Sequence, residues 1–355
     1  MSANKSVTAT FNLCYPTTYT NGPLGTSNPL PACGKGFLID YYGGFNVTWA
    51  QTQTGVLQRE SDIGRNFNGI GIHYGGGGPG PLGDLTNCAY ITPSEQRELW
   101  IHNQGAIPVV SWSPNATLAD INAGSEDACF NEMADYFKQF QFPIMLRLMW
   151  EMDDTGPIWH ATTGTDYVQA WQRIVNLFKA RGATKVGFYW CPTHGVNRTL
   201  ADASYPGDTY VDWVGADGYN HNSGGWDSPL HSGWAELWEI LGYPPTGGNT
   251  SVHDVWGPHK PYIIGETGTV YDSGTPTRKA NWFRNIPTLA VSHMPYLRGV
   301  EFFDQDLAGD VNEKWDWRVD NNQTYDQRQA GIDGTFDATT YQGFLDMAAS
   351  SFFAG

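Results

Sequence analysis

Two glutamates stand where short apolar runs end, and together they could carry acid–base or nucleophilic chemistry. Glu151 follows the run 144–150, and Glu266 follows the run 261–265 before a Thr-Gly exit. A strand buried on both faces is destabilised by a charge, so a carboxylate at its end indicates a functional role. Paired carboxylates can cleave a glycosidic bond, one attacking the sugar while the other donates and then takes a proton.

A purely structural role is the alternative for each glutamate. Glu151 could form a salt bridge, for instance with Arg147 in the same run, and either glutamate could cap the following helix. Two strand-end glutamates that lie three strand–helix units apart favour the catalytic interpretation.

The elements that must position these residues form a repeating series. Eight short apolar runs have the length and composition of buried strands, and their centres lie about 25 to 50 residues apart. The runs are Gly36–Asp40, Gly69–Tyr74, Ile107–Trp112, Pro143–Trp150, Lys185–Trp190, Trp213–Asp217, Tyr262–Gly265 and Gly299–Phe303. Helical patterns lie between or after them, at Pro93–Gln104, Glu126–Phe140, Asp166–Arg181, Trp234–Leu241, Arg278–Val291 and Thr340–Ser350.

Alternating strands and helices favour parallel strand pairing. An open doubly wound sheet would give a similar alternation, but eight units in one series close more naturally into a barrel. We therefore expect an α/β fold, a single (β/α)8 TIM barrel over residues 36–355 with an irregular N-terminal extension over residues 1–35.

The expected barrel brings the two glutamates together. Catalytic groups of such barrels lie at the C-terminal ends of the strands. Glu151 and Glu266 would end the fourth and seventh strands and face each other across the mouth. Roughly 5 to 5.5 Å between two carboxyl groups is the geometry of a retaining glycosidase.

Composition excludes several classes of partner. The formal net charge is −16 and no Lys/Arg run offsets it, so no nucleic acid partner is expected. No stretch approaches the roughly 18 to 20 apolar residues of a membrane span, so no membrane partner is expected either. Charged residues make up only 16% and aromatic residues 14%, which is typical of a secreted, extracellular protein that faces sugars. We expect such a protein to be a monomer.

Five cysteines allow at most two disulfide bonds. Pairing of Cys14 with Cys33 and of Cys88 with Cys129 would close local loops, although the sequence does not fix this connectivity. Cys191 would remain unpaired and is expected to be buried at a strand end.

Motifs for metals and cofactors are absent or incomplete. There is no Cys-x-x-Cys, no His-Glu-x-x-His and no close His/Cys cluster, so no metal is expected. The segment 75–80 fits G-x-G-x-x-G, but Pro79 and a loop follow where a dinucleotide site needs a helix. We read this segment as a wall of the cleft, and no cofactor is expected.

The chain resembles glycoside hydrolase family 26, within the clan of retaining (β/α)8 hydrolases. The resemblance extends over about residues 37–352 and rests on the order and spacing of short motifs. These are Gly64-Arg65, Gly105–Trp112, Pro143–Met152, Trp171, Tyr189-Trp190, Tyr205–Asp208, Tyr210–Asn220, Lys260-Pro261, Gly265–Gly268 and Trp315–Arg318. The resemblance implies that Glu151 is the acid/base, that Glu266 is the nucleophile, and that Tyr219 donates a hydrogen bond to the nucleophile.

Two positions depart from the family pattern. The family places His immediately before the acid/base, and relatives in the clan place Asn, whereas Trp150 stands here. At the eighth strand an aromatic floor, usually Trp, is expected, and this chain has Phe302-Phe303. Both departures lie where the sugar at the cleavage point would bind, so they leave the substrate open.

Candidate substrate contacts are side chains near strand ends. Aromatic rings there could stack on sugar rings, and polar groups could bind hydroxyls. The candidates are Trp112, Trp150, Trp159, Trp190, Trp226, Arg147, His73 and Tyr219.

We therefore expect a retaining endo-glycoside hydrolase that acts on a β-linked polysaccharide, with β-1,4-mannan first. One alternative is the same chemistry on mixed-linkage β-glucan, xylan or another extracellular glycan. Another is a barrel that binds carbohydrate without turnover, which Trp150 motivates.

Overall fold

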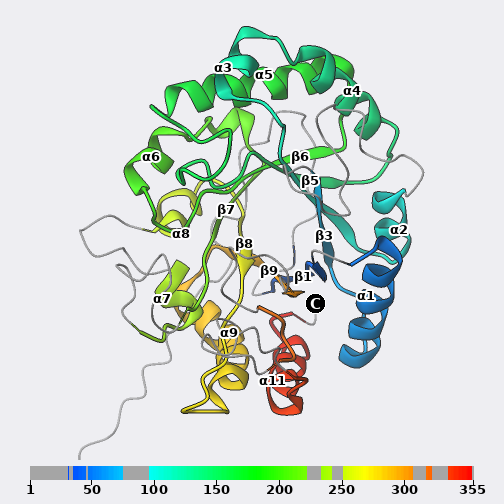
Figure 1. Cartoon of the computed structure of the whole chain (residues 1–355), viewed down its shortest axis with the longest axis vertical. Coiled ribbons are helices and arrows are strands. Elements are labelled where there is room, and N and C mark those ends of the chain that lie inside the picture. The colour runs from blue at the N-terminus through cyan, green and yellow to red at the C-terminus, as the bar shows by residue number, and fades with distance from the viewer. Residues whose placement is uncertain are drawn as a thin grey trace, which may run out of the picture.

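Eight parallel strands close into a barrel in the order β1-β3-β4-β5-β6-β7-β8-β9, and helices surround it (Figure 1). The computed structural model describes residues 31, 35–44, 47–74, 96–221, 233–241, 251–306, 317–321 and 335–353. The barrel strands are β1 (Phe37–Asp40), β3 (Gly69–Tyr74), β4 (Ile107–Trp112), β5 (Ile144–Leu148), β6 (Val186–Trp190), β7 (Trp213–Asp217), β8 (Tyr262–Thr267) and β9 (Leu297–Phe302). The predicted (β/α)8 barrel is confirmed.

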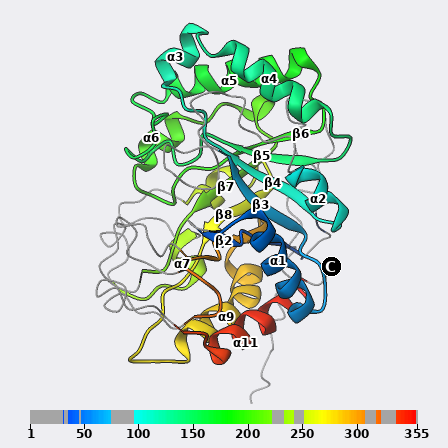
Figure 2. The same cartoon turned by 45° about the vertical axis from the view of Figure 1, so that its right-hand side comes forward.

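The described helices form the outer layer of the barrel. They are α1 (Trp49–Ile63), α2 (Arg97–Asn103), α3 (Leu118–Ala123), α4 (Asp127–Lys138), α5 (Thr165–Arg181), α6 (Arg198–Ala203), α7 (Leu237–Leu241), α8 (Val252–Trp256), α9 (Arg278–His293) and α11 (Ala338–Ala348), with a short 3-10 helix at Asp208–Tyr210. α9 and α11 lie side by side, as both views show (Figure 2). None of the described helices is long and apolar enough to span a bilayer.

A small second sheet extends the seam between the first and last barrel strands. β2 (Gly43–Gly44) and β10 (Gln305–Asp306) pair in parallel, a few residues beyond β1 and β9. β1 and β9 are themselves paired, so the two loops that leave this seam run together above the barrel.

Helix α1 has no counterpart among the helices predicted from the sequence. Its buried residues are Thr52, Val56, Arg59 and Glu60. Only Val56 among them is apolar, and Arg59 donates a hydrogen bond to Asp304 at 2.7 Å. The sequence therefore lacks the regularly spaced apolar residues by which an amphipathic helix is recognised. The signal that remained was the capping box of Thr48 and Gln51 at its start.

Alternate residues of the strands face opposite sides of the barrel wall. One cluster of buried side chains fills the barrel interior: Ile39, Val109, Met145, Tyr189, Cys191, Trp213 and Ile263. The neighbouring positions, such as Val110, Leu146 and Phe188, belong to the larger cluster packed between strands and helices. Cys191, just after β6, is buried and forms no disulfide bond, as predicted.

A β-bulge in β8 changes which residues face the interior. Ala216 pairs with Ile264, whereas Asp217 pairs with Glu266, so Gly265 is an extra residue in β8. Without the bulge, Glu266 would share the outward side of Ile264, two residues earlier. The bulge therefore turns Glu266 toward the same side as Asp217.

Glycine is required at the bulge. A Cβ at Gly265 would lie 2.6 Å from Asp217 Oδ1, 2.6 Å from Cys191 Sγ and 2.8 Å from Tyr189 Oη. These groups are buried and cannot move aside easily, so the packing excludes any side chain at this position.

Three predictions fall on residues outside the described part of the chain. The N-terminal extension lies almost wholly there, so its boundary at residue 35 stays a prediction. Cys14, Cys33 and Cys88 also lie outside it, so the disulfide pairings stay predictions, and so does the role of Trp226.

We predict that Gly265→Ala destabilises the protein. The added methyl group overpacks the barrel interior, and overpacking a core costs about 1–3 kcal/mol of unfolding free energy. Gly156→Ala is the matched control, because a Cβ there meets only Asp154 Oδ2, at an ordinary 3.8 Å. Denaturant unfolding of both variants measures the difference, and equal stability of the two would show that the bulge tolerates a side chain.

Candidate active site

Glu266 lies inside β8 and is held by three side chains. Tyr219 Oη donates to its Oε2 at 2.6 Å, Arg147 Nη2 donates to its Oε1, and His73 Nε2 lies 3.7 Å from Oε1. The expected hydrogen bond from Tyr219 is therefore present. Burial acts to raise the pKa of Glu266, but the charge of Arg147 and the hydrogen bonds from Tyr219 and Arg147 outweigh it, so this pKa lies below its usual range. Glu266 is an ionised carboxylate near neutral pH.

Glu151 lies three residues beyond the end of β5, on a sharp turn. The strand was predicted to continue to Trp150, but it ends at Leu148 because Met149 has a φ of 45° and Glu151 a φ of 53°. Left-handed φ values are uncommon outside glycine and collect at functional sites.

Hydrogen bonds from neighbouring elements hold this turn. Met149 N donates to Trp112 O at 3.0 Å, Tyr167 Oη donates to Met149 O at 2.9 Å, and Glu151 N donates to Cys191 O at 2.8 Å. The surrounding strands and α5 thus fix the position of the Glu151 backbone above the barrel mouth.

The Glu151 carboxyl lies in an environment opposite to that of Glu266. Burial raises its pKa most, Asp217 and Glu266 raise it further, and Arg147 opposes them with a smaller effect. The pKa of Glu151 therefore lies well above its usual range, and the side chain stays protonated where Glu266 is ionised.

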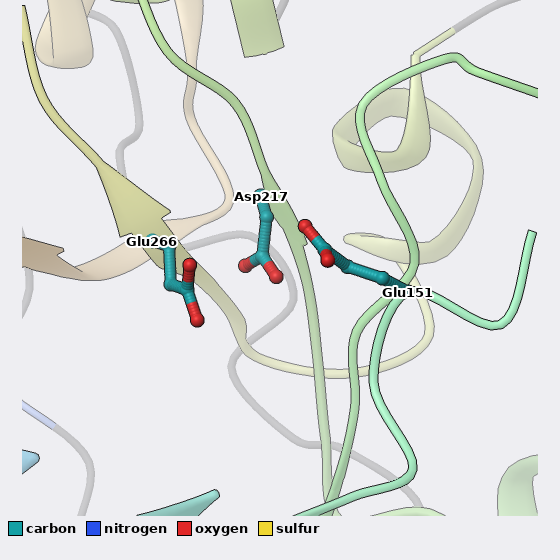
Figure 3. Close-up of side chains that lie close together, drawn as sticks. All are labelled: Glu151, Asp217 and Glu266. Carbon is teal, nitrogen blue, oxygen red and sulfur yellow. The ribbon is translucent and has the colours of Figure 1, made fainter. Parts of the chain in front are cut away.

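Three carboxyl groups meet at the barrel mouth (Figure 3). Oxygen atoms of Glu151, Asp217 and Glu266 all lie within 4.8 Å of one another, and Asp217 lies between the two glutamates. Such a group of oxygens resembles a cation site, but the guanidinium of Arg147 already contacts Asp217 and Glu266. The chain itself thus supplies one positive charge to this group, beside Asp217 and Glu266.

Arg147 has no exposed surface with which to contact a substrate, contrary to the expectation from the sequence. Its side chain is fully buried beneath the carboxyl groups. Nη1 donates to Gly265 O at 2.8 Å and to Asp217 Oδ1 at 3.3 Å, while Nη2 donates to Glu266. The salt bridge considered as the structural alternative is present, but it joins Arg147 to Glu266 rather than to Glu151.

Half-buried aromatic rings line the side of the site next to Glu266. The His73 ring stacks on Tyr41, with centroids 4.1 Å apart, and lies 5.3 Å from Trp150 and 6.2 Å from Phe303. Burial lowers the pKa of His73 to about 3, and Glu266 opposes this only in part, so the ring is neutral. A neutral ring that keeps 13% of its side chain exposed can still exchange a hydrogen bond with a ligand.

Three of the tryptophans predicted to bind substrate have structural roles. Trp112 and Trp190 occupy outward positions of β4 and β6 and are buried against the helix layer, Trp112 on Phe130 and Trp190 on Tyr205. Trp159 is also buried, and its indole N–H donates to Trp150 O at 2.8 Å. Trp150 itself is half-buried at the site, so it stays a candidate contact.

Sequence reasoning missed Tyr41, named Asp217 only as the end of a predicted strand, and named Phe303 only as a departure from the family pattern. Asp217 is the last residue of β7 and shares the inward side with Trp213, so counting alternate positions would have placed it at the mouth. Phe303 follows β9, and its ring lies 6.1 Å from that of Tyr219. A phenylalanine therefore lies beside the site where the family pattern predicts tryptophan.

Comparison with known proteins gives one family match. The model of glycosyl hydrolase family 26 matches residues 108–229. This segment contains Glu151, Asp217 and Tyr219, whereas Glu266 lies beyond it. Endoglucanase H of Acetivibrio thermocellus is 27% identical over 233 residues, which is 62% of this chain and 24% of that protein. The chain thus spans about a quarter of the length of this curated relative.

Solved structures share the barrel. The catalytic domain of a GH26 endo-β-1,4-mannanase from Bacillus sp. JAMB-750 has a TM-score of 0.61 at 15% identity, covering 90% of this chain and 88% of that one. A β-mannanase from a symbiotic protist of the termite Reticulitermes speratus has a TM-score of 0.59 at 12% identity, covering 94% and 96%. At such low identity these structures show the fold, and it agrees with the family match. The family match over residues 108–229 and the shared barrel together make the chain similar to glycosyl hydrolase family 26.

Proposed function

We propose that this chain is a retaining endo-glycoside hydrolase of a β-linked polysaccharide, with Glu266 as nucleophile and Glu151 as acid and base. One observation carries the proposal: one carboxyl oxygen of Glu151 lies within 4.8 Å of one of Glu266, in environments that drive the two pKa values apart. Inverting enzymes need a wider gap, about 6.5–9.5 Å between carboxyl groups, to admit a water molecule.

Each step follows from the protonation state of a glutamate. Glu266 attacks the anomeric carbon while Glu151 donates its proton to the glycosidic oxygen, so that bond breaks and a glycosyl ester of Glu266 forms. Glu151 then takes a proton from water, whose oxygen attacks the same carbon and releases Glu266. Two inversions leave the configuration of the sugar retained.

The surrounding groups prepare Glu266 for attack. Arg147 and Tyr219 donate to different oxygens of its carboxylate, which keeps it ionised and fixes its orientation. Orientation before the reaction lowers the entropy cost of the bimolecular step.

We propose β-1,4-mannan as the first substrate. Support comes from similar solved structures that are described as endo-β-1,4-mannanases. The aromatic rings of Trp150 and Phe303 beside His73 fit stacking on a sugar ring, but stacking alone accepts many pyranoses. His73, whose side chain is 13% exposed beside Glu266, is a candidate to distinguish one hydroxyl orientation from another.

A β-glucan is the second candidate substrate. The curated relative is named an endoglucanase, and it is 27% identical to this chain over 233 residues, whereas the mannanase domain from Bacillus sp. JAMB-750 is 15% identical. Trp150, where the family pattern has a polar residue, is the local departure that would accompany such a change of sugar.

Hydrolysis of a panel of β-mannan, mixed-linkage β-glucan and xylan tests the function. We expect wild type to release reducing sugar from mannan and to form the retained anomer first, as NMR of fresh product would show. Glu266→Ala should abolish turnover, and Glu151→Ala should lower it by about 10²–10⁴-fold because proton donation is lost. Glu132→Ala, on the exposed side of α4, is the control and should keep full activity.

The other outcomes of the panel are equally informative. Full activity in either active-site variant, or an inverted first product, would contradict the assigned roles. Turnover of glucan alone would move the substrate to the second candidate. Binding of glycans by wild type without turnover would favour a carbohydrate-binding barrel.

The rate should depend on pH as a bell-shaped curve. Activity needs Glu266 ionised, so it falls as pH drops through a pKa that lies below the usual range for Glu. Activity also needs Glu151 protonated, so it falls as pH rises through a pKa that lies well above that range. A profile of kcat/KM measures both limbs, and in Glu151→Ala the alkaline limb should vanish with an aryl glycoside whose leaving group needs no proton. Persistence of that limb would assign it to another group.

A further inference from the structure

Asp217 is a buried carboxyl at the barrel mouth that the two-glutamate mechanism does not use. It is the last residue of β7 and only 1% exposed. Its carboxyl lies between those of Glu151 and Glu266, within 4.8 Å of both (Figure 3). A buried charge is unfavourable unless it is paired, so this position needs an explanation.

The hydrogen bonds of Asp217 satisfy only one of its oxygens. Oδ1 accepts from Arg147 Nη1 at 3.3 Å and from Cys191 Sγ at 3.1 Å. Oδ2 is buried and accepts no hydrogen bond from the described residues. The carboxyl of Glu151 is in place to supply the missing proton.

The charges around Asp217 do not balance if every acid is ionised. Among the described groups that face it, Arg147 is the cation, and the others are acids or hydroxyl and thiol groups. These groups are Arg147 and Glu151 from β5 and its loop, Tyr189 and Cys191 from β6 and its end, Tyr219 just after β7, Tyr262 and Glu266 from β8, and Glu301 from β9. Since Glu266 already offsets Arg147, a second and third carboxylate charge would lack a partner.

Burial raises the pKa of Asp217 to about 8, although Arg147 opposes it, and the neighbouring Glu266 raises it further. The pKa of Glu151 is raised by burial and then by Asp217 itself. Two carboxyl groups at this separation hold at least one proton between them near neutral pH.

We propose that Asp217 is a positioning residue that shares one proton with Glu151 and so keeps Glu151 protonated until the leaving group takes that proton. The proposal rests on the proposed function, in which Glu151 is the acid. Asp217 does not touch the substrate, and it acts through Glu151.

The proton and the charge balance through both steps. When the glycosidic oxygen takes the shared proton, the glycosidic bond breaks and Glu266 loses its charge by forming the ester. The two carboxyls of Glu151 and Asp217 are then both ionised, while the total charge of the cluster with Arg147 is unchanged. In the second step, the proton taken from water returns to the pair as Glu266 is released as a carboxylate.

Asp217→Asn tests the proposal. The amide keeps the acceptor for Arg147 and Cys191, removes the like charge beside Glu151, and offers a donor that stabilises ionised Glu151. We expect the alkaline limb of the kcat profile to move to lower pH by about one unit or more, with KM nearly unchanged. Asp212→Asn is the matched control at the other end of β7, where Asp212 accepts from Phe188 N at 2.8 Å, and it should leave the limb in place.

Cys191→Ser gives a shift of the opposite sign. A hydroxyl is a stronger donor than a thiol, so it stabilises ionised Asp217 and leaves more of the proton on Glu151. The alkaline limb should therefore move to higher pH. This variant is a second test of the proposal if Asp217→Asn does not fold, because a limb that stays in place or moves to lower pH would contradict proton sharing.

A titration without substrate separates this proposal from the proposed function. Protein labelled with ¹³C at the glutamate carboxyl, with Glu151→Gln to assign the signal, reports the protonation of Glu151 even if no glycan is hydrolysed. Movement of that titration to lower pH in Asp217→Asn supports proton sharing. An active enzyme whose alkaline limb and Glu151 titration are the same in wild type and Asp217→Asn would overturn it, while the proposed function would stand.

Discussion

A buried guanidinium among carboxylates is the interaction on which the site depends. Arg147 is fully buried, and its hydrogen bonds go to Gly265 O, Asp217 and Glu266. A buried ion pair contributes little net stability, but removing one partner leaves an uncompensated charge, which is strongly destabilising. Arg147 and the two acids must therefore be kept together, and β5, β7 and β8 must hold a fixed register to do so.

The same cation gives two glutamates different chemistry. Arg147 donates directly to Glu266, so its charge lowers the pKa of that group despite burial. At Glu151, burial and the charges of Asp217 and Glu266 dominate, and Arg147 only reduces their effect. The separation of the two pKa values thus comes from geometry, because both residues are glutamates in one buried site. The proposed roles of nucleophile and acid thus depend on which glutamate accepts a hydrogen bond from the guanidinium of Arg147.

The sequence predicts the barrel and the place of each strand well, because apolar runs and their spacing depend on burial, although β5 ends two residues earlier and β8 two residues later than predicted. It misses features that depend on long-range pairing. Helix α1 buries Arg59 against Asp304. Because charged residues are usually exposed, the sequence gives no sign that this face of the helix is buried. The roles given to Trp112 and Trp190 were wrong because proximity to a strand end was used without the alternation that points both rings outward.

The position of Glu266 could not be derived from strand periodicity. Counting alternate residues in β8 places Glu266 outward with Ile264, and the bulge at Gly265 reverses this. A bulge is defined by the pairing of two strands, so the alternation of residues within β8 alone does not reveal it. Gly265 is the one sign of the bulge in the sequence of β8, since a Cβ there would meet Asp217, Cys191 and Tyr189.

The departure at Trp150 has a physical consequence that the family pattern alone does not suggest. Its ring lies 4.9 Å from the guanidinium carbon of Arg147, which is an attractive contact. An apolar ring over that cation also limits the access of water, and a lower local dielectric strengthens the interaction between Arg147 and Glu266. A polar residue at this position would contact substrate or the proposed nucleophile directly, whereas Trp150 acts on ionised Glu266 through Arg147. Loss of the polar residue is therefore compatible with an ionised Glu266, and the effect of Trp150 should fall on the choice of sugar more than on the chemistry of cleavage.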